Sequence, residues 1–195
     1  FMAYFAENAL GGGSAFPSVK GMEQAVVDMA LCLFQAPAGA AGFMSTGGSE
    51  SILLAVHTAR RVGREQRGNP RHQGNLVAPE TLHPAFDKAA DLMDIEIRRV
   101  PVRADLRADV AGLAAAIDAD TVMLVGSAPN FPYGMVDPIG ELSELALSRG
   151  VWLHVDACVG GYLAPFARRL GRPVPAFDFS LSGVRSISAD LHKYG

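Results

Sequence analysis

The stretch VWLHVDA at positions 151–157 decides the fold of this chain. It is a short, largely apolar run that reaches an acidic residue, Asp156, near its end. A second apolar run, TVMLV at 121–125, is bounded by Asp120 and Gly126. Apolar runs of this length between turn residues are typical of buried strands in a parallel sheet. We therefore predict two buried strands, with Asp156 at the point where one of them ends.

Further strands and helices are predicted to alternate around these two runs. Apolar residues at helical spacing predict helices at 22–33, 49–62, 83–92, 110–117 and 139–148. Short strands are expected at 76–78, 95–100, 179–181 and 185–187, and an exposed loop at 64–74. Gly63 is interpreted as the stop of the second helix, because Arg60 and Arg61 precede it. The alternation indicates an α/β fold, with a mostly parallel sheet flanked by helices.

The composition argues against several classes of protein. The chain of 195 residues is 49% hydrophobic and 19% charged, with a formal net charge of −3, so nothing points to nucleic acid or an anionic membrane. Its mean hydropathy of +0.19 is slightly apolar, which suits a piece that other protein covers. The most apolar stretch, 25–34, contains Asp28 and is too short to span a bilayer. Cys32 and Cys158 lack paired spacing, and we expect two reduced core thiols in a cytoplasmic protein.

The first candidate site is the turn STGGSE at 45–50, which opens a predicted helix. Gly47 and Gly48 would let the backbone approach an anion closely, and the first amides of the helix would point at it. Ser49 would add a hydroxyl group. An ordinary helix cap by Ser49 explains the same residues, so the turn alone leaves both interpretations open.

The second candidate is Asp156, since ligands in open α/β sheets bind beyond the carboxyl ends of the strands. A buried carboxylate there needs a cationic partner, and a protonated pyridine nitrogen would serve. Ala157 is small enough to lie beneath a flat ring. A helix-capping aspartate is the alternative interpretation. We expect Cys158, the next residue, to contribute packing rather than reactivity.

Lys193, His192 and His83 complete the candidate set. A partly desolvated lysine has a lowered pKa and forms a Schiff base with an aldehyde, and His192 would donate to a phosphate. A solvated surface pair is the alternative for these two residues. His83 follows a predicted strand, where it would stack on an aromatic ring or simply cap a helix. No Cys/His set has zinc spacing, so we expect no metal.

Five segments together identify a family. They are STGGSESI at 45–52, PETLHPAFDKAA at 79–90, VGSAPNFPYG at 125–134, HVDACVGG at 154–161 and GVRSISADLHKYG at 183–195. With these segments the chain resembles the sphingosine-1-phosphate lyases, within the group II pyridoxal-phosphate-dependent decarboxylase superfamily. The resemblance covers the chain from about residue 15 to its end.

The resemblance implies a role for each candidate residue. Lys193 would form the internal aldimine with pyridoxal 5'-phosphate, Asp156 would pair with the pyridine nitrogen, and His83 would stack on the ring. The residues that would hold the phosphate are Gly47, Gly48, Ser49 and His192, and those that would line the ring are Ala128 and Ala157.

The resemblance also implies an architecture. The fold would be the aspartate-aminotransferase type, fold type I, in a homodimer with active sites at the interface. Residues 1–40 would form an N-terminal segment and first helix, and 41–195 the cofactor-binding large domain. Because the chain stops just after Lys193, we expect a fragment that lacks the smaller C-terminal domain. The membrane-anchoring helix of the eukaryotic lyases is not seen in the sequence.

The implied activity is a carbon–carbon lyase reaction on a small-molecule amine. A sphingosine-1-phosphate lyase cleaves a phosphorylated sphingoid base by a retro-aldol step, which yields a long-chain aldehyde and phosphoethanolamine and belongs to sphingolipid metabolism. The alternative is an L-amino-acid decarboxylase, and therefore carboxylic acid metabolism. A third interpretation, of another class, is a non-catalytic fragment of such an enzyme. Substrate-side residues that decide between these interpretations are largely missing from the chain.

Overall fold

The computed structural model describes residues 16–195, and these residues form two compact units that meet in sequence between Ser45 and Thr46. Each unit is described by itself. The expected domain boundary after residue 40 stays a prediction. Within the described residues, no helix combines the length and the apolar character needed to cross a membrane.

The first unit contains the helix α2, Pro17–Leu33. Pro17 lies in the first turn, where its missing N–H group costs no helical hydrogen bond. Val27 and Phe34 are buried, and they are two helical turns apart on one side of the helix. The expectation of a core thiol at Cys32 is wrong, because Cys32 is exposed. Its position five residues after Val27 turns it roughly 140° away from that buried side.

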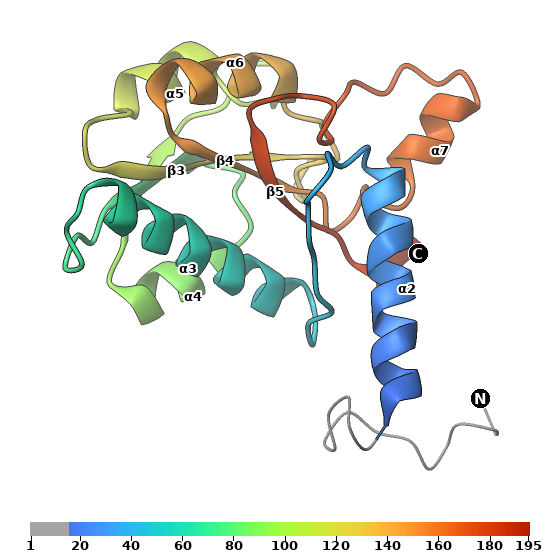
Figure 1. Cartoon of the computed structure of the whole chain (residues 1–195). Helices are drawn as coiled ribbons and strands as arrows, with labels where there is room; N and C mark the ends of the chain where they lie inside the picture. Colours follow the sequence, from blue (N-terminus) through green and yellow to red (C-terminus); the bar gives the residue numbers. More distant parts are fainter. Residues whose placement is uncertain (1–15) are drawn as a thin grey trace. The chain divides into compact units, whose positions relative to one another are not determined.

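The second unit is built on a five-stranded parallel sheet with the strand order β2-β1-β3-β4-β5 (Figure 1). The strands are β1 Asn75–Pro79, β2 Glu96–Val100, β3 Thr121–Ser127, β4 Trp152–Asp156 and β5 Val184–Ser188. All residues of β1 and β3 are buried, which explains the apolar runs within them at 76–79 and 122–125. The prediction of an α/β fold with a mostly parallel sheet is confirmed.

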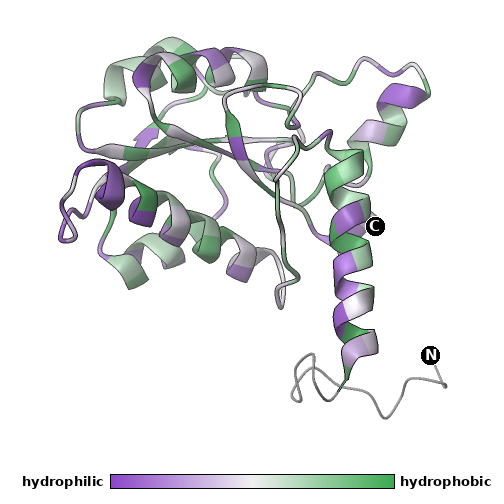
Figure 2. Cartoon of the chain, in the orientation of Figure 1, coloured by the Kyte–Doolittle hydropathy of each residue, from purple (hydrophilic) through white to green (hydrophobic). Residues whose placement is uncertain are grey.

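Helices cover both faces of this sheet. The helices of the second unit are α3 Gly48–Gln66, α4 Ala85–Met93, α5 Val110–Ala116, α6 Ile139–Arg149, α7 Ala164–Arg169 and α8 Leu191–Tyr194. Helices α3 and α4 pack together on one face, and α5 and α6 lie on the other (Figure 1). Figure 2 shows hydrophobic and hydrophilic residues alternating along α3, as in a helix with one face on a core. That core includes Ile52, Phe86 and Met123, all nearly inaccessible.

The predicted stop of α3 at Gly63 is wrong. The helix continues to Gln66, and Gly63 is buried inside it. A Cβ atom at Gly63 would lie 2.7 Å from Cγ1 of Val122 on β3. The missing side chain therefore lets the helix approach the sheet closely, and the glycine serves packing rather than termination.

Two further expectations for secondary structure need correction. Residues 179–181 form a turn and not a strand, because the Asp178 carboxylate accepts hydrogen bonds from both the amide and the hydroxyl of Ser180. Such local side-chain bonds compete with strand pairing. Helix α4 begins at Ala85, two residues later than predicted, after Pro84. The short helices α7 and α8 were not predicted, since neither is long enough to show helical periodicity.

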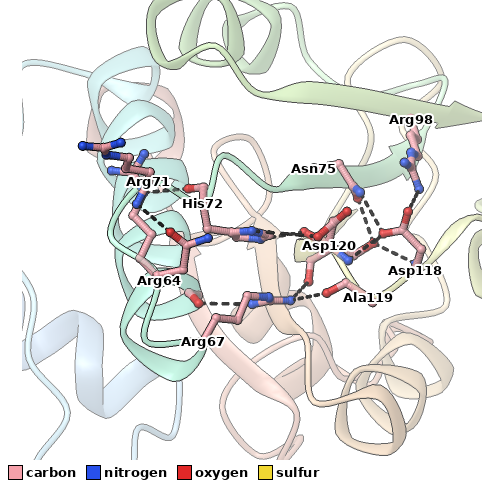
Figure 3. A network of polar contacts seen from close by, with 12 residues as sticks. Arg64, Arg67, Arg71, His72, Asn75, Arg98, Asp118, Ala119 and Asp120 are labelled. Atoms are coloured by element: carbon pink, nitrogen blue, oxygen red, sulfur yellow. Dashed lines mark hydrogen bonds and ion pairs between the residues drawn. The ribbon is translucent and has the colours of Figure 1, made fainter.

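A polar network joins the amino ends of β1 and β3, opposite the edge where these strands end (Figure 3). The buried Asn75 donates to Asp118 at 2.9 Å and accepts from the hydroxyl of Thr121 at 2.8 Å. Arg98 forms an ion pair with Asp118, and Arg67, the residue that follows α3, donates to a backbone carbonyl in the same turn. The hydrogen bonds from Asn75 and Arg98 hold the pKa of Asp118 well below its usual range. Every contact in the network is internal, so we interpret it as a set of interactions that stabilises the amino ends of β1 and β3.

Candidate active site

A cavity of about 540 Å³ lies at the carboxyl ends of β3 and β4, beside the start of α3. Most of the residues predicted from the sequence line it: Gly47, Gly48, Ser49, His83, Asp156, His192 and Lys193. Ala128 and Ala157, in contrast, are fully buried and are not among its lining residues. Segments from four separate parts of the sequence thus meet at one edge of the sheet, as the topology requires.

The glycine turn forms the part of the cavity wall at the start of α3. Gly47 is the N-cap residue and has a φ of 150°, a backbone conformation that favours glycine. The cap position is therefore not Ser49, which lies inside the first turn of the helix. A Cβ atom at Gly48 would lie 2.8 Å from both carboxylate oxygens of Asp190 and 3.0 Å from the Cys158 sulfur. Only glycine fits this position, and the first helix amides of Gly48 and Ser49 are available to an anion.

Asp156 is held rigidly at the end of β4. It pairs in register with Ser127 of β3 on one side and Ser188 of β5 on the other. Its Oδ1 atom accepts hydrogen bonds from the Cys158 amide at 3.1 Å and from the Ser188 hydroxyl at 3.3 Å. Its carboxylate is therefore a buried, oriented acceptor at the cavity wall.

His154 lies two residues earlier on the same side of β4 and is fully buried. Its ring contacts the hydroxyls of Ser186 at 2.8 Å and Ser188 at 3.2 Å, and its edge meets Phe86. Burial lowers the pKa of His154 to about 4, although the charge of Asp156 acts in the opposite direction. The imidazole is neutral at physiological pH, and its contacts are part of the packed core.

Lys193 projects from α8 into the cavity and forms an ion pair with Asp190. Its Nζ atom lies 2.9 Å from Oδ2 of Asp190, whose side chain is 5% exposed. The expected lowering of the lysine pKa is wrong. Burial does act to lower it, but the hydrogen bond and charge of Asp190, helped by Cys158 and Asp156, outweigh burial and raise the pKa of Lys193. The amine is therefore held in its protonated form.

His83 is both a helix-capping group and a cavity residue, so the two interpretations of it are compatible. Its Nδ1 atom accepts a hydrogen bond from the Ala85 amide at 3.1 Å, which places the proton of the neutral ring on Nε2. Phe131 meets the ring edge-on, with the centroids 5.0 Å apart. These two contacts fix the orientation of the imidazole.

Asp190 and Phe131 are among the cavity residues that sequence reasoning missed. Asp190 stands three residues before Lys193 at the start of α8, and that spacing was the signal available. Phe131 lies inside one of the family segments but carries no polar group. Cys158 behaves as expected, since burial, followed by the charge of Asp156, raises the pKa of its thiol. It packs and does not act as a nucleophile.

The chain is similar to known proteins over nearly its whole length. The family described as the pyridoxal-dependent decarboxylase conserved domain matches residues 12–195. A sphingosine-1-phosphate lyase from Oryza sativa subsp. japonica is 48% identical over 92% of this chain and 34% of the relative. A probable L-tyrosine/L-aspartate decarboxylase from Methanosarcina acetivorans is 40% identical over 98% of this chain and 50% of the relative.

A solved structure agrees with these sequence matches. A sphingosine-1-phosphate lyase from Burkholderia pseudomallei superposes with a TM-score of 0.85 at 45% identity, covering 91% of this chain and 42% of that chain. The chain therefore spans between a third and a half of the length of these three proteins.

Proposed function

The chain belongs to the pyridoxal-dependent decarboxylase family, and from that premise we propose that it is the cofactor-binding core of a pyridoxal-phosphate-dependent carbon–carbon lyase. One observation carries the proposal. Lys193 and Asp156 line the same cavity as the glycine turn at the start of α3. A single flat cofactor with an aldehyde, a ring nitrogen and a phosphate requires these groups together.

The residues present fit that cofactor. Gly48 begins a long helix whose first backbone amides favour a phosphate, and a Cβ atom at this position would crowd Asp190 and Cys158 at the same wall of the cavity. Lys193 supplies the amine, and His192, which is largely exposed, supplies a second donor. When bound, pyridoxal phosphate supplies an electron sink for the carbanion formed by bond cleavage.

The protein's own contribution is orientation and electrostatics. Asp156 would keep a proton on the ring nitrogen, since a buried carboxylate is most stable beside a cation. His83, fixed by Ala85 and Phe131, would present its ring to the cofactor face. Ala128 and Ala157, which are fully buried, would support the ring from behind the cavity wall.

We favour a sphingosine-1-phosphate lyase over an amino-acid decarboxylase. The proposed substrate is a phosphorylated sphingoid base, cleaved to a long-chain aldehyde and phosphoethanolamine. The support is the similarity to lyases from rice and Burkholderia pseudomallei, at 48% and 45% identity. The second candidate is an L-amino-acid decarboxylase, which the archaeal relative at 40% identity supports.

A product assay decides between the candidates. The protein, loaded with pyridoxal phosphate, is incubated with a phosphorylated sphingoid base and, separately, with aromatic and acidic amino acids. Aldehyde release supports the lyase, and carbon dioxide release supports the decarboxylase. Lys193→Ala should abolish both products and the visible absorbance of the bound cofactor, whereas Lys88→Ala, on the exposed face of α4, is the matched control. A protein that never acquires cofactor absorbance would contradict both candidates and favour a non-catalytic role.

We also propose that the protein works as a homodimer with the active sites at the interface. The support is that Phe131 and Tyr133, in the loop beside the cavity, are each about half exposed, as is common for side chains that a partner covers. Light scattering measures the assembly. Mixing Lys193→Ala with a variant inactivated elsewhere in the cavity should restore activity only if two chains share a site. A cytoplasmic location stays a prediction.

A further inference from the structure

Asp190 is a buried acid that the proposed cofactor roles leave unused. It precedes α8, and its amide bonds to the Cys158 carbonyl, which anchors it against the segment after β4. Both carboxylate oxygens lie close to Gly48, so a Cβ added there would be 2.8 Å from each of them. An anionic group therefore stands at the amino end of α3, beside the turn proposed to hold a phosphate.

The nearest basic side chains to this carboxylate belong to two residues that follow it closely in sequence. The Lys193 ammonium is 2.9 Å away, and the Nε2 atom of His192 is 3.9 Å away. The other titratable groups facing this region come from separate elements: Glu50 of α3, His83 before α4, and Asp156, Cys158 and Tyr162 in or after β4. Asp190 and Asp156 are the carboxylates that raise the pKa of Lys193, so the field around this amine is negative and favours its ammonium form.

An ammonium group cannot attack an aldehyde, because it has no free electron pair. The amine must first release one proton to solvent. Its nitrogen then forms a bond to the aldehyde carbon, and the carbonyl oxygen leaves as water together with the two remaining protons. A carboxylate in hydrogen-bond contact with the ammonium opposes the first of these steps. The same carboxylate also repels an incoming phosphate at the start of α3.

We propose that Asp190 is a positioning residue that holds the Lys193 ammonium in place and slows its reaction with an incoming aldehyde. The restraint applies to any aldehyde, and it is stronger for one that carries a phosphate. The identity of the natural aldehyde, pyridoxal phosphate, rests on the proposed function, but the effect of Asp190 on Lys193 does not.

The first test uses a small uncharged aldehyde. The protein is treated with formaldehyde and cyanoborohydride at a series of pH values, and methylation of each lysine is followed by peptide mass spectrometry. Lys20 and Lys88 are exposed and serve as internal controls. Lys193 should show a higher midpoint than both. In Asp190→Asn its midpoint should fall, and a fall of one pH unit raises its rate about tenfold below both midpoints.

The exposed Asp91→Asn on α4 is the matched variant, and it should leave the Lys193 profile unchanged. An identical Lys193 midpoint in wild type and Asp190→Asn would overturn the proposal. The comparison of Lys193 with Lys20 and Lys88 in wild type needs no variant. A Lys193 midpoint at or below theirs overturns the proposal even if Asp190→Asn does not fold.

The second test compares pyridoxal phosphate with pyridoxal, which lacks the phosphate, by the rate at which absorbance of the bound aldehyde appears. Asp190→Asn should accelerate both reactions, and the factor should be larger for the phosphorylated aldehyde. If Asp190→Asn accelerates both reactions by the same factor, the proposed repulsion between Asp190 and the phosphate is wrong. If neither aldehyde is taken up while the formaldehyde profiles differ as expected, the proposed function fails and the role of Asp190 stands.

Discussion

Replacing His154 with glutamine should remove much of the protein's sensitivity to mild acid. The ring is buried in β4 and is neutral when folded, with a pKa lowered from 6.5 to about 4 by burial. Above pH 6.5 the histidine is neutral in the folded and unfolded chains alike. As the pH falls from 6.5 towards 4, the unfolded chain takes up a proton that the folded chain refuses, so stability is lost in that window.

The magnitude follows from the two pKa values. At about 1.4 kcal/mol for each pH unit between them, the loss at pH 4 is about 3 kcal/mol. A typical domain has a free energy of unfolding of about 5–15 kcal/mol, so this one residue accounts for a sizeable share. Glutamine has no proton to gain, and it retains donors and acceptors for the two serine hydroxyls that the ring contacts.

The assay is urea unfolding, monitored by circular dichroism, at a series of pH values between about 7.5 and about 4.5, which covers most of the window in which the protonation of His154 costs stability. The difference in unfolding free energy between wild type and His154→Gln should shrink or reverse as the pH falls. His57→Gln, on the exposed side of α3, is the control and should run parallel to wild type. A difference from His154→Gln that stays constant across the series refutes the reasoning.

Substitutions at Gly63, Gly48 and Asp137 test the packing and the site. Gly63→Ala should destabilise the protein by about 1–3 kcal/mol through overpacking against Val122. Gly140→Ala, in α6 with open space around it, should be neutral or stabilising by up to about 1 kcal/mol, and thermal unfolding compares the two. Gly48→Ala should raise the Kd for pyridoxal phosphate in a fluorescence titration, because its Cβ would collide with Asp190 and Cys158 and shift the turn proposed to hold the phosphate. An unchanged Kd would contradict that role of the turn. Asp137→Ala should cost about 2–5 kcal/mol, since Asp137 accepts two buried backbone hydrogen bonds at 2.9 and 2.8 Å. Asp137→Asn, which keeps one acceptor, should cost less in the same urea assay.

The buried strands and the edge that carries the site were predictable from the sequence. Apolar runs report burial on both faces directly, and the carboxyl ends of parallel strands necessarily share one edge of the sheet. This placed Asp156 correctly at the end of a buried strand. The glycine turn was predictable as a flexible opening to a helix.

The errors share a physical cause, which is that a local pattern does not show what a residue faces. Gly63 has the sequence context of a helix stop, and only the position of Val122 shows that it is a packing contact. The pKa of Lys193 depends on the balance between burial and the charge of Asp190, and the outcome of two opposing effects cannot be read from a motif. Cys32 has apolar neighbours in sequence, yet it lies on the exposed side of α2.

The two walls of the cavity come from distant parts of the second unit's sequence. The glycine turn opens the unit, whereas Asp190 and Lys193 come from its last turn of helix. Helix α8 has four residues, too few to be stable by itself in water, so contacts across the cavity must hold it in place. A molecule that contacts both walls would therefore stabilise α8 against local unfolding. Binding should slow amide hydrogen exchange most in α8 and β5. The slowing should be smallest at the amino ends of the strands, far from the cavity.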